Sequence, residues 1–307
     1  MKAEGRRLIL VHLLLLVLLY EIMFVPNQRT TVRDYDALLV GIAVIEALFL
    51  FALWYCKRRG TLSTGPFDII LVVWLLMIVW ELTTSVLNVA HPVLVPCPEN
   101  VFDTFRKQWS LLLLNVGYSM ELLLLGFALG LTAAVLLGLV AGWVPRIRAF
   151  AYPIANVMAP IPAIVISPYL VALMPTFRSA SLVVIILGIF WPTFLTTVNR
   201  VQNMEVQILD SARTLQPSTM TMLTRILLPY ILPGVISGLR VSMTTSLLML
   251  NFAELMGATH GMGYYVQNSI TYANYTHAVA GIFVIGIVVT ILNFLVGKLQ
   301  KWAIRWH

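Results

Sequence analysis

The sequence predicts an all-α integral membrane protein with about eight transmembrane spans. Sixty per cent of its 307 residues are hydrophobic, only 11% are charged, and the mean hydropathy is +0.90. Soluble domains contain about a quarter charged residues, so a chain this apolar could not remain monomeric in water. The formal net charge of +7 does not indicate nucleic-acid binding, because basic residues of membrane proteins gather in cytoplasmic loops.

Eight segments are long and apolar enough to cross a membrane as helices. Because a helix rises about 1.5 Å per residue, about 30 Å of hydrocarbon requires about twenty apolar residues. The predicted spans cover residues 8–25, 37–56, 67–90, 113–142, 151–174, 181–199, 230–253 and 277–297. The first also has the basic start of a signal peptide, but no small-x-small cleavage site follows, which favours a retained span.

The lysine and arginine residues predict the orientation of these spans. If the N-terminus lies in the cytoplasm, fourteen of them fall in inner loops, five in outer loops and Arg240 near the inner end of the seventh span. Basic residues are enriched in cytoplasmic loops, so both termini are predicted to be cytoplasmic. A polar insert at 200–229, between the sixth and seventh spans, then lies on the cytoplasmic side.

An amphipathic segment at 96–109 precedes the fourth span. Val101, Phe102, Phe105 and Trp109 share one face of a helix there, opposite the charged residues. This pattern predicts either a short helix on the outer membrane surface or a loop helix packed on the protein. Neither alternative implies chemistry.

The polar insert is predicted to contain two short helices with a break between them. Residues 210–215 suit a helix with an acidic residue at its positive N-terminal end. Pro217 disfavours helical geometry at Gln216 and suits the first turn of the next helix. Pro229 and Pro233 then lead into the seventh span.

The insert resembles the EAA loop of binding-protein-dependent ABC importer permeases. The pattern of that loop is Glu-Ala-Ala, three residues, Gly and, further on, Ile-x-Leu-Pro. Asp210, Ser211 and Ala212 occupy its first three places, Gln216 occupies the glycine place, and residues 226–229 match its end.

Further motifs resemble the sulfonate, nitrate and taurine branch of these permeases and follow the expected order. They lie at residues 80–82, 95–98, 126–130, 160–162, 213–218, 228–234 and 253–263. The resemblance covers about 67–305. It implies an ABC permease transmembrane domain at 61–307, with a six-helix core and a cytoplasmic coupling loop at 200–229. Two extra transmembrane helices precede that core as an N-terminal hairpin at 1–60, which either packs against it or recruits another subunit.

The resemblance also implies where the chain lies and what it meets. It places the chain in the bacterial plasma (inner) membrane as a multi-pass protein among membrane lipids. The implied partners are cytoplasmic ABC ATPase subunits, an extracytoplasmic solute-binding protein and a second permease subunit in a homodimer or a heterodimer. No cofactor is expected in this chain, because ATP and Mg are expected on the partner ATPase. Similar permeases serve many solutes, so the solute is not predicted.

By the same resemblance, the coupling loop touches an ATPase and transmits its closure. The implied coupling residues are Glu205, Asp210, Ser211, Ala212, Arg213, Thr214, Gln216, Leu228 and Pro229, the last two as a hinge. Glycine tolerates positive φ and close backbone approach, whereas glutamine does neither well. We therefore expect that Gln216 alters coupling, and one hypothesis is that this chain pairs with a permease bearing the fuller motif.

A second set of candidate residues follows the seventh span. The glycine pattern there points to a gate or substrate site, because glycines permit irregular backbone beside a cavity. Its members are Glu254, Gly257, His260, Gly261 and Gly263. A purely structural re-entrant turn is the alternative, and His260 alone does not indicate a metal or proton site.

Charged residues within spans often mark a transport pathway. Glu46 lies in the extra hairpin, where a structural pairing is favoured, whereas Glu81 and Glu121 mark either a pathway or the membrane interface. Arg240 is expected to extend towards the cytoplasm or its lipid headgroups.

The sequence contains little that indicates a catalytic or metal-binding site. The chain has no Gly-x4-Gly-Lys-Ser/Thr, His-Glu-x-x-His or Gly-x-Ser-x-Gly motif. Cys56 and Cys97 fall on opposite predicted sides, so neither a disulfide nor a metal site is expected. Gly130, Gly138 and Gly142 indicate close helix packing.

Three functions remain open from the sequence, and each predicts a different experimental result. The favoured function is the membrane subunit of an ATP-driven importer, which would co-purify with an ATPase that the solute-binding protein stimulates. An ion-coupled secondary transporter would transport its solute without ATP and would stop when an ionophore is added. A membrane scaffold would show no transport under either condition.

Overall fold

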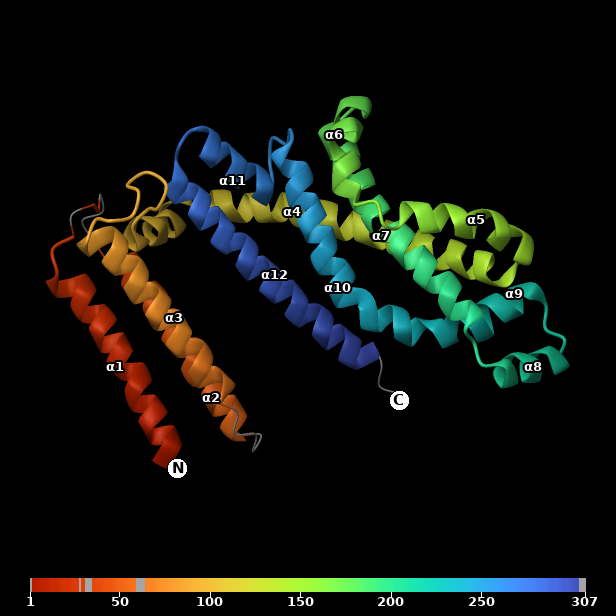
Figure 1. The fold of residues 1–307 in the computed structure, drawn as a ribbon, viewed down its shortest axis with the longest axis horizontal. Helices are drawn as coiled ribbons and strands as arrows, with labels where there is room; N and C mark the ends of the chain where they lie inside the picture. The colour runs from red at the N-terminus through yellow and green to blue at the C-terminus, as the bar shows by residue number, and fades with distance from the viewer. Residues whose placement is uncertain (1, 28, 31–34, 59–63, 304–307) are drawn as a thin grey trace. The chain divides into compact units, whose positions relative to one another are not determined.

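The part of the chain that the structure describes is mostly helical, and no strand occurs there. This computed structural model describes residues 2–27, 29–30, 35–58 and 64–303, with the side chains of all of these except residues 2–4 and 213. The helices, labelled in Figure 1, are α1 (Lys2–Phe24), α2 (Asp36–Arg58), α3 (Gly65–Glu81), η1 (Leu82–Val86), α4 (Pro98–Trp143), α5 (Pro145–Met158), α6 (Ala163–Leu173), α7 (Phe177–Gln202), α8 (Val206–Thr214), α9 (Thr219–Thr221), η2 (Met222–Leu227), α10 (Leu228–Leu255), α11 (Met262–Thr271) and α12 (Tyr275–Ala303).

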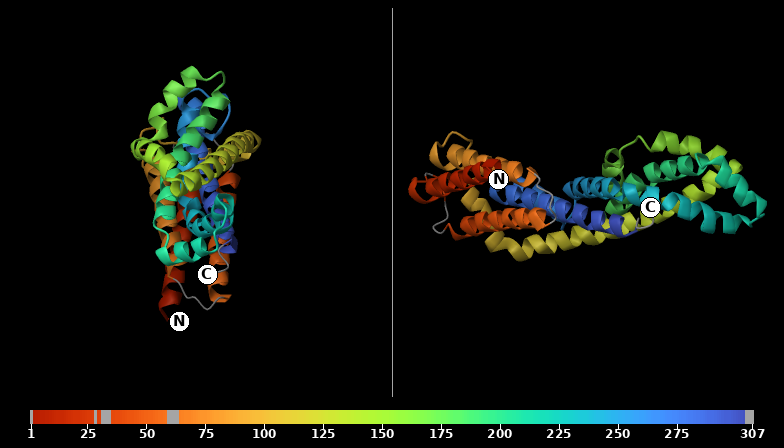
Figure 2. Two further views of the ribbon diagram at one scale, coloured as in Figure 1. Left: turned by 90° about the vertical axis from the view of Figure 1, so that its right-hand side faces the viewer. Right: turned by 90° about the horizontal axis from the view of Figure 1, so that it is seen from below.

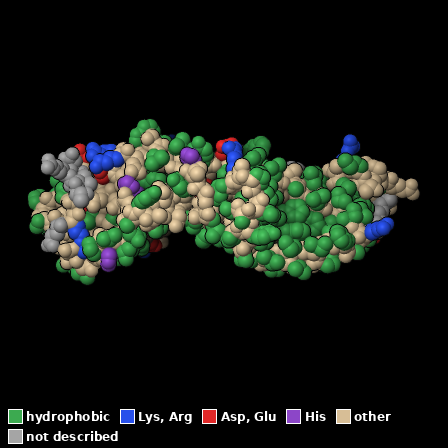
Figure 3. Space-filling model, turned by 90° about the horizontal axis from the view of Figure 1, so that it is seen from above, with side chains coloured by type: hydrophobic (Ala, Val, Ile, Leu, Met, Phe, Trp, Pro, Cys, Tyr) green, Lys and Arg blue, Asp and Glu red, His purple; other side chains and the backbone are tan. Residues whose placement is uncertain are grey.

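Within the described residues, seven helices are long and apolar enough to cross a membrane, and a bent pair brings the total to as many as eight. Large hydrophobic side chains are exposed along these helices, and Figure 3 shows hydrophobic side chains spread over the face in view, with charged ones in small groups. The all-α membrane fold class is therefore confirmed, with two extra spans ahead of a six-helix core.

The predicted fifth span is broken in the structure. In place of one helix over 151–174, α5 ends at Met158 and α6 begins at Ala163, with a bend of 95° between them (Figure 1). Pro160 and Pro162 lie at the break, and a proline both lacks an N–H and disfavours helical geometry in the preceding residue. The two prolines therefore account for the bend.

Contacts divide the chain into two compact units. The first unit comprises residues 1–112 and 268–282, and the second comprises 113–267 and 283–307. The predicted domain boundary at residue 60 lies outside the described residues, and so do Arg33, Arg59 and Arg305, which the predicted orientation counted.

The core of the first unit joins the extra hairpin to α3. Leu18 of α1, Leu38 of α2 and Trp74 of α3 are buried in one cluster, and α1 packs along α3 (Figure 1 and Figure 2). The start of α4 packs here too, because the ring of Phe102 lies over Gly41 of α2. The 96–109 segment is thus a helix packed on the protein.

Small residues set the packing of α4 against α7 in the second unit. A Cβ added at Gly138 would lie 2.8 Å from the Cβ of Thr197, and one added at Gly142 would lie 2.7 Å from the Cβ of Val201. A Cβ at Gly130 would lie 3.2 Å from the backbone of Ile186. These approaches confirm the prediction that the three glycines serve close helix packing.

Candidate functional site

The helix that carries the coupling motif is α8, which lies in the second unit. It begins where the carbonyl oxygen of Glu205 accepts hydrogen bonds from the N–H groups of Ile208 and Leu209, each at 3.1 Å. The Ser211 hydroxyl donates to the Gln207 carbonyl at 2.7 Å, which keeps that side chain along the helix. The helix ends at Thr214.

One face of α8 is anchored in a hydrophobic cluster. Ala212 is only 7% exposed and packs in a cluster with Leu139 of α4, Met222 and Leu227 of η2, and Ile231 of α10. Ala212 therefore faces the protein, and its small side chain lets α8 lie close to the membrane helices.

The opposite side of this segment is open. Glu205, Asp210, Ser211, Thr214 and Gln216 are all exposed. The structure thus brings five of the implied coupling residues to the surface and Ala212 to the core, whereas the side chain of Arg213 lies outside the described part.

The break after α8 is confirmed, but the second short helix is not separate from the seventh span. Residues Thr219–Leu255 form one continuous helical stretch, and Leu228 and Pro229 lie within it. The new helix also starts two residues later than predicted, because Ser218 is its N-cap and Pro217 therefore precedes the helix instead of lying in its first turn. The Ser218 hydroxyl accepts a hydrogen bond from the Thr221 N–H at 3.3 Å.

Two backbone features lie next to this segment. Gln216 has a φ of 43°, which is the left-handed conformation that glycine favours. The stretch Met222–Leu227 is a π-helix, a local widening often found at functional sites. Leu228 and Pro229 follow this π-helical stretch directly. Their role as a hinge stays a prediction.

Exposed apolar side chains flank the coupling motif, and the sequence analysis did not select them. Leu215 is 80% exposed, and Val206 and Met220 are also exposed. Their apolar character in an otherwise polar insert could have identified them in the sequence, because such residues are usually buried or contact a partner.

The candidate gate segment between α10 and α11 is a turn held by a buried carboxylate. Glu254 is 1% exposed. It accepts hydrogen bonds from the Ser119 hydroxyl at 2.6 Å and from the Gly263 N–H at 2.7 Å. Ser119 in turn accepts from the Met262 N–H, and Asn115 accepts from the Gly261 N–H, both at 2.8 Å.

The glycines of this turn differ in what the geometry requires of them. Gly261 has a φ of 123°, and a side chain there would overlap the carboxylate of Glu254. A side chain at Gly263 would overlap the Asn251 carbonyl. In contrast, a Cβ at Gly257 would meet nothing closer than 3.8 Å.

His260 lies apart from this network. Its ring stacks obliquely on Tyr118, with 4.6 Å between ring centroids. Both residues line a cavity of about 280 Å³, together with Glu121 and Arg178, which form an ion pair there. The structure thus joins Glu254, Gly261 and Gly263 in the turn and places His260 at a separate cavity. Asn115 and Ser119, polar residues one turn apart on α4, were missed by the sequence analysis.

The predicted intramembrane acids have distinct surroundings. Glu46 pairs with His12 across the hairpin at 3.5 Å, in agreement with the structural pairing that we favoured. Glu81 is buried beside Glu99 and Ser85. Glu99 accepts a hydrogen bond from the Asn27 side chain.

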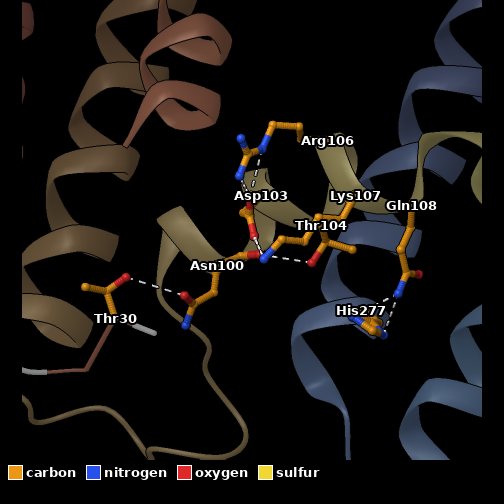
Figure 4. A network of polar contacts seen from close by, with 8 residues as sticks. All are labelled: Thr30, Asn100, Asp103, Thr104, Arg106, Lys107, Gln108 and His277. Atoms are coloured by element: carbon orange, nitrogen blue, oxygen red, sulfur yellow. Dashed lines mark hydrogen bonds and ion pairs between the residues drawn. The ribbon is translucent and has the colours of Figure 1, made fainter. Parts of the chain in front are cut away.

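A polar network surrounds the kink of α4 in the first unit. Figure 4 shows Arg106 and Lys107 directed at Asp103, and Gln108 directed at His277 of α12. Gln108 has non-helical angles of φ −117° and ψ 19°, which mark the kink. Its side-chain amide lies 3.2 Å from Nε2 of His277.

In the part of the chain that the structure describes, no group of three or more His, Cys, Asp or Glu residues is placed so that it could hold a metal ion. Cys56 and Cys97 are both free thiols. Burial raises the pKa of the Cys97 thiol, which lowers its reactivity at neutral pH.

Comparisons with known proteins point to transport. The family described as binding-protein-dependent transport system inner membrane component matches residues 126–306. The taurine transport system permease protein TauC of Escherichia coli K12 is 28% identical over 83% of this chain and 92% of its own length. The putative aliphatic sulfonates transport permease protein SsuC of Bacillus subtilis is 23% identical over 82% of this chain and 91% of its own length. A solved chain of the inward-facing MetNI methionine ABC transporter has a TM-score of 0.49 and 20% identity over 64% of this chain and 97% of its own length.

Proposed function

Because the chain belongs to the family of binding-protein-dependent transport system inner membrane components, we propose that its α8 segment is the contact through which an ATPase drives transport. The family assignment makes the chain a transmembrane permease subunit of an ABC importer, a transport component and not an enzyme. Such permeases work with ATPases and solute-binding proteins. The assignment favours this function over the ion-coupled transporter and the scaffold.

One observation carries the proposal: α8 is anchored on one face and open on the other. Ala212 is buried against the membrane helices, whereas Asp210, Ser211 and Thr214 are exposed beside the apolar side chain of Leu215. A helix with this arrangement offers a partner both hydrogen-bonding groups and apolar area. Its anchored face lets movement of the partner displace the helices behind it.

Movement would reach the membrane through a continuous helix. Thr219–Leu255 follows the turn at Gln216 without interruption, and Met222 and Leu227 pack in the same cluster as Ala212. Displacing α8 would therefore push on the start of α10. The π-helical stretch and Pro229 are the places where this long helix would bend.

The remaining partners follow from the same function. ATP and Mg would bind to the ATPase subunits, and a second permease, identical or different, would complete the pathway. The chain would lie in the bacterial inner membrane with both termini and α8 in the cytoplasm. The relatives' names include aliphatic sulfonates, taurine, formylaminopyrimidine and nitrate, which do not agree on one solute.

The decisive experiment compares two exposed leucines in purified transporter. Leu215→Asp places a charge beside the exposed face of α8, and Leu94→Asp does the same in the loop before α4, which is predicted to lie outside. We expect Leu215→Asp to lower ATPase co-purification and solute-binding-protein-stimulated ATP hydrolysis about tenfold, because burial of a leucine at an interface contributes about 1.5–3 kcal/mol. Leu94→Asp should leave both near the wild-type level. Equal effects of the two variants would contradict the assignment of α8.

A further inference from the structure

Arg200 lies in the last turn of α7 and borders two cavities of the second unit. The larger, about 650 Å³, is lined by the start of α10, by Asn203 and by Ile208 of α8. The smaller, about 220 Å³, runs between α7 and α10. Arg200 lines both. Among the described residues that line them, it is the only charged one.

The position of the guanidinium group depends on a glycine. Gly234 lies on α10, and a side chain there would overlap the guanidinium of Arg200. Arg200 therefore lies directly over the backbone of α10. Gly238, one turn further on, also lines the smaller cavity, but a Cβ added there would meet no atom within 4 Å.

Two hydrogen-bond donors of this region are buried without partners. Nε of Arg200 and Oγ1 of Thr197 contact neither solvent nor a hydrogen-bonding atom of the described residues. Thr197 is 0% exposed, and its Cβ and methyl group face Gly138 of α4. An unpaired buried donor is unfavourable, so a ligand that reaches these donors after a small movement of the neighbouring side chains would be favoured by accepting from them.

The neighbouring hydroxyl groups narrow the chemistry of the ligand. Thr196 already donates to the Pro192 carbonyl at 2.7 Å, and Ser237 donates to the Gly234 carbonyl at 2.8 Å. The smaller cavity is also lined by the permanently charged guanidinium of Arg200 and by the hydroxyls of Thr193, Thr197 and Ser242. An oxyanion accepts from guanidinium and hydroxyl donors alike, and arginine binds such groups in a bidentate manner.

We propose that Arg200 and Thr197 form a binding site for the oxyanion group of a small organic anion, such as a sulfonate or carboxylate, in the cavity between α7 and α10. The identification of this anion as the transported solute rests on the proposed importer function. A lipid phosphate offers the same oxygen chemistry. Because Ile208 of α8 lines the adjoining cavity, an anion held here lies next to the segment proposed to touch the ATPase.

The first test measures binding of 1-butanesulfonate to the full-length chain, purified with its associated subunits in phosphatidylcholine nanodiscs without ATP. We expect Arg200→Gln to weaken binding about tenfold or more, because it removes a charge-assisted hydrogen bond, and Arg200→Lys to retain part of it. Thr197→Val should weaken binding severalfold, whereas Thr197→Ser should preserve it. A matched pair of variants is Gly234→Ala and Gly238→Ala. Gly234→Ala displaces the guanidinium and should weaken sulfonate binding, whereas Gly238→Ala leaves the guanidinium in place and should bind like the wild type.

The second test replaces part of the phosphatidylcholine with phosphatidylglycerol and measures retained lipid by native mass spectrometry. Sulfonate binding that depends on Arg200 supports a solute site, and phosphatidylglycerol retention that depends on Arg200 supports a lipid phosphate in the same place. The proposal is overturned if neither probe binds, or if Gly234→Ala and Arg200→Gln bind both probes like the wild type. ATPase co-purification from the same preparations reports on the importer function separately, so the two failures can be told apart.

Discussion

Gln216 holds a backbone conformation that its side chain disfavours. Its φ of 43° lies in the left-handed region, where a residue with a Cβ pays about 1–2 kcal/mol relative to the right-handed one. The family pattern has glycine at this place. The chain thus keeps the backbone turn of the motif with a residue that strains it, which is a physical basis for altered coupling.

Replacing Gln216 with glycine should relieve this strain. We expect Gln216→Gly to stabilise the turn by about 1 kcal/mol, so that backbone amides in 206–221 exchange with deuterium about fivefold more slowly. Gln216→Ala keeps the Cβ and should leave exchange unchanged. Similar exchange in both variants would mean that the turn carries no strain.

Gly261 is the glycine of the α10–α11 turn for which both φ and space forbid a side chain. Gly261→Ala should destabilise the protein by about 2 kcal/mol or more, because it combines a strained φ with overlap of the Glu254 carboxylate. Gly257→Ala is the matched control, since its nearest neighbour would be 3.8 Å away. The measurement is the unfolding temperature in detergent, and equal values for the two variants would contradict this account.

Hydrogen bonds from α4 fix how α10 turns into α11. Ser119 donates to Glu254 and accepts from the Met262 N–H, so one hydroxyl links three elements. This pattern favours the structural turn over a mobile gate for Glu254, Gly261 and Gly263, whereas His260 lines a separate cavity and its part in a pathway stays a prediction.

A double-mutant cycle between Ser119 and Glu254 tests that link. We expect Ser119→Ala and Glu254→Ala each to lower stability, and the double variant to lose less than the sum by about 0.5–3 kcal/mol, as for contacting residues. Chemical unfolding of the purified protein provides the free energies. Additive losses would show that the two side chains act independently.

The helical elements were predictable to different degrees, and proline explains both the success and the failure. The break at Gln216 and Pro217 follows from local geometry and was predicted. Pro229 and Pro233 were expected to lead into the seventh span, whereas both lie inside the continuous helical stretch Thr219–Leu255, with the π-helical stretch Met222–Leu227 just before them. The bend at Pro160 and Pro162 had the same local signal but lay within an apolar run that concealed it.

The orientation of the whole chain is a prediction that labelling can test. In a Cys56→Ser background, a membrane-impermeant maleimide should label His91→Cys in intact cells and Ser218→Cys only after permeabilisation. Both positions are exposed, and Cys97 is buried with a raised thiol pKa, which keeps the background low. The opposite pattern would reverse the predicted orientation and place α8 outside the cytoplasm.

The sequence by itself determined that the chain crosses a membrane as helices, since apolar runs of that length must satisfy their backbone hydrogen bonds internally in lipid. It also determined the family, through an ordered set of short motifs. Only the tertiary structure decided that Ala212 faces inward, that Ser119 bonds Glu254 and that Arg200 lies over Gly234. These contacts join residues far apart in the chain, and their geometry depends on how helices pack, which local composition does not specify.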